Sequence, residues 1–147
     1  MRSGMGPGTV SGEQVISRTI QPDEVSLFLF SAATWLPHRI HYDRDYAMSE
    51  GHQDLLVHGP LQGSYLVQMV HEWLAQRGGV LESFQYRHVA PAYVGRELLC
   101  RAVISPAAPT ADCRYDAWQF DLSITDVVDE RTTTTGAAFG RPGRMTA

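Results

Sequence analysis

The stretch PLQGSYLVQMVHEWLAQR, residues 60–77, is the strongest indication of fold class in this 147-residue chain. Its apolar residues recur three, four and seven positions apart, which is the spacing of one face of an α-helix. This stripe consists of Leu61, Tyr65, Leu66, Met69, Val70, Trp73 and Leu74. Pro60 favours a helix start, and Gly78-Gly79 favours a helix end. We expect one continuous helix over residues 60–77, mostly buried at Leu66, Met69, Val70 and Trp73.

The hydrophobic period changes on both sides of this helix. Four segments after it alternate apolar and polar side chains and contain β-branched or aromatic residues, which is typical of strands; they are residues 80–90, 97–105, 115–127 and 132–139. A strand over 13–20 and two short helices, one after Pro22 and one over 44–49, come before it. Consecutive strands favour an antiparallel sheet, so the sequence predicts an α+β fold with the sheet wrapped around the long helix.

Length and composition indicate one domain. The chain is 44% hydrophobic and 19% charged, so it can bury a core. Residues 1–12 and 140–147 are rich in glycine, and we expect them to be flexible tails around a domain over 13–139.

Several partner and cofactor classes are not expected. The net charge of -4 argues against a nucleic-acid binder. No run approaches the roughly 20 apolar residues that span a bilayer, and the first residues lack the apolar centre of a signal peptide. We therefore expect a cytoplasmic protein without a membrane partner. The sequence has two cysteines and no HExxH, GxGxxG or GxxxxGK[ST] motif, so we expect neither a metal nor a nucleotide cofactor.

Two motifs carry a resemblance to a known family. They are LPHRIHYDRDYA, residues 36–47, and LLVHGPL, residues 55–61. Both resemble the MaoC-like, type 2 hydroxyacyl-thioester dehydratases, and more closely the subgroup that includes mesaconyl-CoA hydratase. The resemblance covers about residues 28–103. It implies a hot-dog fold, reversible hydration of a 2-enoyl thioester of CoA or acyl carrier protein, and a dimer with itself or with another hot-dog chain.

The resemblance also implies roles for single residues. His41 matches the histidine that moves the proton of the water, a step that suits an imidazole with a pKa near 6.5. Gly59 matches the backbone N–H that binds the thioester carbonyl at a helix start. Five residues before His41 the family has Asp or Asn, and this chain has Leu36. His38 matches a histidine of the subgroup and is expected to share the catalytic role.

Substrate-binding positions are expected at Leu36, Arg39, His58 and Leu61. Other interpretations stay open: Arg39 could make a surface ion pair, and Asp43 could cap the helix over 44–49. His71 and His88 are interpreted as structural or surface residues.

Two alternative functions follow from the same residues. Leu36 would also fit a catalytically degenerate subunit that completes the acyl site of a mixed dimer. A hot-dog thioesterase would need an acid on the central helix, where Glu72 is the only one and lies near the far end.

Overall fold

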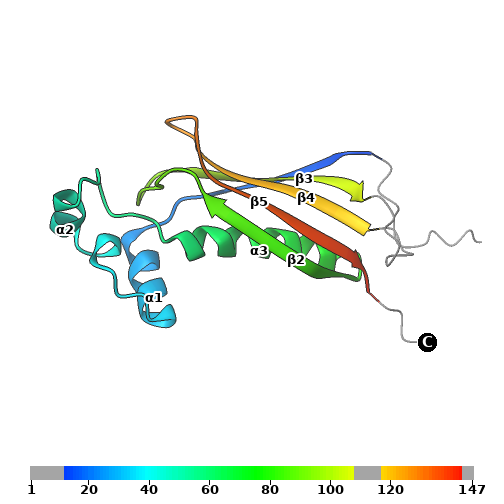
Figure 1. Ribbon diagram of the computed structural model, residues 1–147, viewed down its shortest axis with the longest axis horizontal. Helices are drawn as coiled ribbons and strands as arrows, with labels where there is room; N and C mark the ends of the chain where they lie inside the picture. Colours follow the sequence, from blue (N-terminus) through cyan, green and yellow to red (C-terminus); the bar gives the residue numbers. More distant parts are fainter. Residues whose placement is uncertain (1–11, 108–116, 144–147) are drawn as a thin grey trace, which may run out of the picture.

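The computed structural model describes residues 12–107 and 117–143. Within these ranges the chain order is β1 (Gln14–Ile20), α1 (Glu24–Thr34), the short 3₁₀ helix η1 (Arg39–His41), α2 (Arg44–Ser49), α3 (Gly59–Ala75), β2 (Gly79–His88), β3 (Leu98–Ala107), β4 (Ala117–Asp126) and β5 (Arg131–Pro142). The strands form one antiparallel sheet in the order β1-β3-β4-β5-β2. Helix α3 runs across one face of this sheet, and α1 and α2 lie beyond its amino-terminal end (Figure 1). The predicted α+β arrangement of one sheet around one long helix is confirmed.

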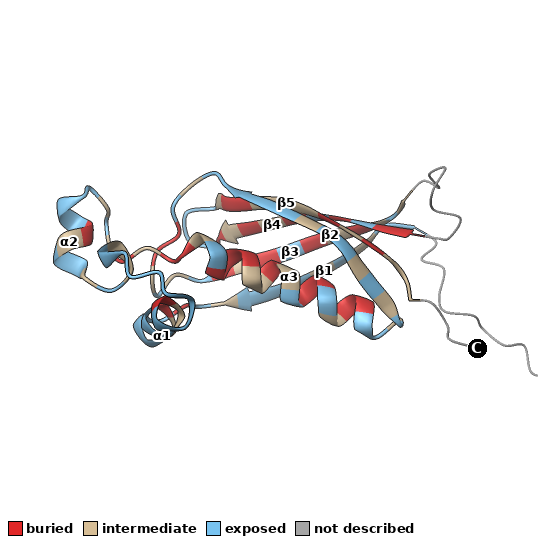
Figure 2. Cartoon of the chain, turned by 60° about the horizontal axis from the view of Figure 1, so that its bottom comes forward, coloured by how far each residue is buried: buried red, intermediate tan, exposed pale blue. Residues whose placement is uncertain are grey.

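The core lies between α3 and the sheet. The four helix residues expected to be buried are 0–4% exposed: Leu66, Met69, Val70 and Trp73. Alternate residues of β3 and β4 face them, among them Ile104, Phe120 and Ile124, each 0% exposed. The Trp73 ring meets Phe120 edge-on, with centroids 5.3 Å apart. Figure 2 shows the buried side of α3 turned toward the sheet and its exposed side turned away. This burial holds the start of α3 at a fixed place.

Local signals set the element boundaries. Asp23 caps α1 by accepting a bond from the Ser26 N–H at 2.7 Å, and Asp43 caps α2 through the Tyr46 N–H at 3.0 Å. Helix α1 ends at Trp35, whose φ of 55° places a non-glycine residue in the left-handed region. The expected role of Asp43 as a helix cap is confirmed.

Two strands run past their expected ends. β3 continues through Pro106 to Ala107, beyond its expected end at residue 105. The β1 register ends at Ile104, so Pro106 lies where β3 has no described neighbour on that side, which is where a strand tolerates the missing N–H. β5 continues to Pro142, paired with Gly79, so residues 140–142 belong to the sheet and not to a flexible tail.

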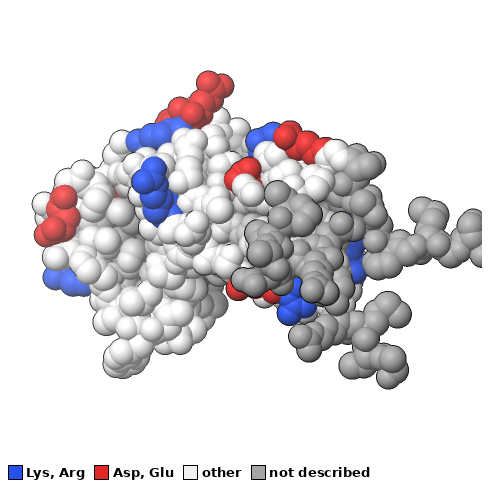
Figure 3. All heavy atoms as spheres, turned by 45° about the vertical axis from the view of Figure 1, so that its right-hand side comes forward, with Lys and Arg blue, Asp and Glu red and all other residues white. Residues whose placement is uncertain are grey.

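The surface carries scattered charge. On the face in Figure 3, basic and acidic side chains are interspersed and most of the surface is uncharged. No helix among the described residues is both long enough and apolar enough to cross a membrane.

Candidate active site

Three segments meet at the amino-terminal end of α3: η1, residues 55–57 and the segment that contains Ala92. η1 carries His41, and an extended segment, residues 55–57, leads into His58 and Gly59. This segment is held on both sides: the Leu56 N–H donates to the Ile40 carbonyl at 3.0 Å, and the Val57 N–H donates to the Ala92 carbonyl at 2.9 Å. The two sequence motifs are therefore joined by the backbone hydrogen bond between Leu56 and Ile40.

His41 has a defined tautomer. Its Nδ1 lies 2.8 Å from the Leu56 carbonyl oxygen. A carbonyl can only accept, so Nδ1 carries the hydrogen, and Nε2 of the neutral ring keeps a free lone pair. Burial lowers the pKa of His41; the Leu56 bond opposes this change, and nearby His38 lowers the pKa further. His41 is thus a neutral base with its Nε2 available.

The imidazole of His58 packs against the imidazole of His41. The two imidazoles are stacked, with centroids 3.7 Å apart and planes inclined by 19°. His58 is fully buried, and its Nε2 lies 2.7 Å from Oγ of Ser31 on α1. The pKa of His58 is lowered to about 4. Burial is the larger cause, and repulsion from His41 when that ring is charged is the smaller one. Both rings are therefore neutral near pH 7.

A pocket of about 420 Å³ opens beside these groups. Its described lining comprises Ile40, His41, Leu56, Val57, Gly59, Gln62, His88, Ala90, Pro91 and Ala92. A volume of this size suits a small-molecule ligand. A smaller hollow of about 340 Å³ over β2 and β5 contains no imidazole, thiol or carboxylate among its described lining.

Gly59 is the first residue of α3, so its N–H has no partner within the helix and lies at the positive end of the helix dipole. The structure brings His41 and Gly59 to the same pocket, as the resemblance implied. A methyl group at Gly59 would overlap the ring of His88, so a larger residue at this position requires that ring to move.

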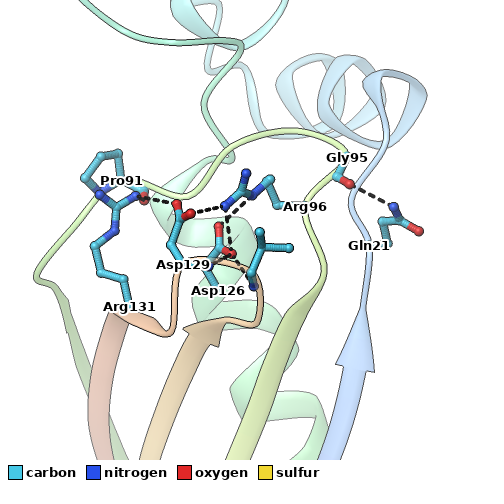
Figure 4. A network of polar contacts seen from close by, with 8 residues as sticks. Gln21, Pro91, Gly95, Arg96, Asp126, Asp129 and Arg131 are labelled. Atoms are coloured by element: carbon cyan, nitrogen blue, oxygen red, sulfur yellow. Dashed lines mark hydrogen bonds and ion pairs between the residues drawn. The ribbon is translucent and has the colours of Figure 1, made fainter.

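One wall of the pocket is fastened by a polar network outside it (Figure 4). The Arg131 guanidinium donates to the Pro91 carbonyl at 3.2 Å. Arg96 pairs with the buried Asp126 at 3.0 Å and with Asp129 at 2.7 Å. Together these contacts hold the segment from residue 91 to 96, which contributes Pro91 and Ala92 to the pocket.

The other expected site residues lie outside the described lining. Leu36 is 38% exposed in the irregular segment after α1. His38 is exposed at the start of η1, with its ring centroid 6.1 Å from that of His41. Arg39 makes the ion pair allowed for it, with Asp43 at 2.6 Å, and covers the Tyr46 ring. Leu61 is buried in the core.

Glu72, the acid weighed for a thioesterase, is not in the pocket. It lies near the carboxyl end of α3, pairs with Arg18 and accepts from Gln68 at 3.0 Å.

Sequence reasoning missed two polar contributors. His88, expected to be a structural or surface residue, is exposed, and it also lines the pocket. Ser31 was not singled out, although it anchors His58. Neither residue carries a local signal, because its role depends on a contact between distant segments. Among the described residues, no three His, Cys, Asp or Glu side chains are grouped in a way that could hold a metal ion.

Comparison with known proteins places these features in a family. The sequence model of hydroxyacyl-thioester dehydratase type 2 matches residues 7–94. A mesaconyl-C(4)-CoA hydratase of Chloroflexus aurantiacus is 42% identical over 79 residues, which are 53% of this chain and 27% of that protein. The chain thus spans about a quarter of the length of this relative.

Two solved structures are similar in fold. An (R)-hydratase of A. caviae involved in PHA biosynthesis has a TM-score of 0.73 at 17% identity, covering 91% of this chain and 99% of that one. The ChsH1-ChsH2 complex of Mycobacterium tuberculosis provides a chain with a TM-score of 0.76 at 15% identity, covering 91% and 99%. At these identities the likeness supports the hot-dog fold.

Proposed function

The chain belongs to the type 2 hydroxyacyl-thioester dehydratase family, and we propose that it catalyses the reversible hydration of a 2-enoyl thioester to a 3-hydroxyacyl thioester. The observation that carries this proposal is the meeting of His41 and Gly59 in one pocket. Hydration needs a base for the water and a donor for the charge that develops on the thioester oxygen. Nε2 of His41 and the N–H of Gly59 are suited to these two tasks.

The reaction can be written with these two groups. Nε2 of His41 takes a proton from water while the water oxygen bonds to C3. The electrons of the C2–C3 double bond move toward the thioester oxygen, which accepts a hydrogen bond from the Gly59 N–H. His41 then returns the proton to C2, and one water has been added overall. Dehydration follows the same steps in reverse.

The lining of the pocket favours an uncharged acyl chain. Ile40, Leu56, Val57, Ala90 and Ala92 present apolar side chains, and no arginine is among the described lining residues. Arg39, the nearest candidate in the motif, is engaged by Asp43. An acyl chain ending in a carboxylate would lose its hydration here without gaining a cation. We therefore expect a short or branched aliphatic 2-enoyl group on CoA or acyl carrier protein.

The chain is expected to work as a dimer. β2 lies at one edge of the described sheet and leaves its outer side unpaired. The partner is either a second copy or another hot-dog chain. The similarity to a chain of the ChsH1-ChsH2 complex supports the mixed assembly as one of these two arrangements.

A second candidate function rests on Leu36. An apolar side chain stands five residues before His41, and a chain of this kind could serve as the non-catalytic subunit of a mixed dimer. In that case the acid or amide would come from the partner chain.

Turnover by the purified chain separates the two candidates. Hydration of crotonyl-CoA, longer straight-chain and branched 2-enoyl-CoA thioesters, and mesaconyl-CoA is followed by loss of enoyl absorbance. We expect turnover of the uncharged thioesters, with kcat/KM at least about tenfold above that for mesaconyl-CoA. No turnover by the chain alone, with activity gained only on co-purification with a second hot-dog chain, would favour the supporting subunit.

A further inference from the structure

The pocket contains a second imidazole for which the reaction as written has no use. His88 is the last residue of β2, and its Nε2 lies against Gly59, at the place where a methyl group on Gly59 would be. The residue is exposed to solvent and lines the same pocket as His41. The ring therefore lies in the pocket wall beside the start of α3.

The hydrogen bonds behind His88 fix its tautomer. Thr134 Oγ1 donates its single hydrogen to Gln62 Oε1 at 2.8 Å. The contact of 2.9 Å between Thr134 Oγ1 and His88 Nδ1 must then be a bond donated by the imidazole. Nδ1 carries the hydrogen, and Nε2 of the neutral ring keeps a free lone pair. Thr134 is fully buried, so this orientation is imposed by the core of the protein.

His41 and His88 both line the pocket, and the Nε2 of each neutral ring carries no hydrogen. Nδ1 of His41 donates to the Leu56 carbonyl, and Nδ1 of His88 donates to Thr134 Oγ1. In each neutral ring, Nε2 is therefore the nitrogen that can accept a hydrogen bond. A water molecule has two hydrogens to donate, and two acceptors are needed to orient it. Held in this way, its oxygen lone pair is free to point toward the carbon that it attacks.

We propose that Nε2 of His88 is the second acceptor for the attacking water, and that His41 and His88 hold this water between them. The inference rests on the proposed hydration. His41 takes the proton that leaves the water, the oxygen bonds to C3, and the second O–H bond stays intact and donated to His88. His88 itself neither gains nor loses a proton, so its role is to position the water.

The other imidazoles near the pocket fit this task less well. The His58 ring is fully buried under His41 and is not among the lining residues. His38 is exposed outside the lining, and its Nδ1 accepts a long bond of 3.4 Å from the Ile40 N–H. Leu36 can accept nothing. Among the described residues, His88 is the imidazole besides His41 that both lines the pocket and has a fixed tautomer.

Substitution of His88 in the full-length protein tests the inference. His88→Leu is expected to lower kcat for crotonyl-CoA hydration by roughly 10²-fold, with KM changed by less than about threefold. His88→Gln, whose side-chain oxygen can accept the same bond, should recover part of this loss. Because His88 is exposed at a strand end, both variants should keep the wild-type melting temperature.

A matched pair of threonines separates orientation from stability. Thr133 and Thr134 are both fully buried, and both donate to Gln62 Oε1, but Thr134 also accepts from His88. Thr133→Val and Thr134→Val should lower the melting temperature similarly. Of the two variants, only Thr134→Val should lower kcat, by about tenfold, because the His88 ring is then no longer held in one tautomer.

The possible failures are distinguishable. An active wild type with His88→Leu within about threefold of it would overturn the role of His88 and leave the proposed hydration intact. Nitrogen-15 spectra of the imidazoles provide a readout that does not depend on turnover: a hydrogen on Nε2 of neutral His88 would overturn the inference. A wild type without turnover on every thioester, alone and in mixed dimers, would overturn the proposed function and the inference with it.

Discussion

The rings of His41 and His58 lie parallel within 19°, with their centroids 3.7 Å apart. A stack this close tolerates little charge, since a proton on one ring raises the cost of a proton on the other. His58 is fully buried between Ser31, the Phe30 ring and His41, which makes it the ring with the lower pKa. The stack therefore favours the neutral form of His41, in which that residue can act as a base.

The buried His58 should make the stability of the protein depend on pH. Its pKa is about 4 in the folded chain and about 6.5 in the unfolded chain, so the unfolded state binds the extra proton between these values. The free energy of unfolding should fall as the pH drops from about 6.5 toward 4, by up to about 3 kcal/mol. Urea unfolding of wild type and His58→Gln across this range measures the effect, which the variant should lack. His71→Gln, which removes an exposed imidazole from the same helix, should keep the wild-type slope.

The rate should depend on pH through His41. Burial lowers the pKa of His41, and the reaction uses its neutral form, so activity should be lost only at pH values below the ordinary histidine pKa of about 6.5. The acidic limb of kcat/KM against pH reports this value. An acidic limb above 6.5 would contradict the buried environment that the structure gives this ring.

Gly59 and Gly63 provide a matched pair on one helix. A methyl group at either position would overlap an aromatic ring of β2: His88 in the first case and Tyr86 in the second. Gly59→Ala should displace His88 from the pocket and lower hydration by roughly 10²-fold or more. Gly63→Ala meets no imidazole, so we expect lower thermal stability with a smaller change in rate. Equal losses of activity in the two variants would show that general damage to the α3–β2 contact explains both.

Leu36→Asn should be tolerated. Leu36 is 38% exposed and is not among the described pocket lining, so an amide there should change the free energy of unfolding by less than about 1 kcal/mol. If His88 orients the water, the rate should stay within about threefold of wild type. A large gain in rate would instead show that the loop after α1 approaches the reacting water and that the native chain lacks an acceptor.

Much of the fold could be predicted because it depends on local periodicity. The stripe of α3 and the alternation of the strands record which side of each element is buried. The extension of β3 through Pro106 could not be predicted, because it depends on where the register of the neighbouring β1 ends. The end of β5 at Pro142 likewise depends on its pairing with Gly79.

The site residues also divide into those that a local motif identifies and those whose place depends on contacts between distant segments. His41 and Gly59 belong to contiguous motifs, so the sequence identifies them and the structure brings them to one pocket. His88 follows Gly59 by almost thirty residues in a strand with no motif, and its position depends on how β2 packs on α3. His38 and Arg39 lie inside the motif, yet their side chains lie outside the described lining.

The decisive measurement is the hydration rate of crotonyl-CoA by wild type and by His41→Ala, compared on folded protein. We expect turnover by wild type and a loss of at least roughly 10²-fold in kcat for His41→Ala, with the melting temperature nearly unchanged. His41→Ala that hydrates the thioester as fast as wild type would contradict the assignment of His41 as the base.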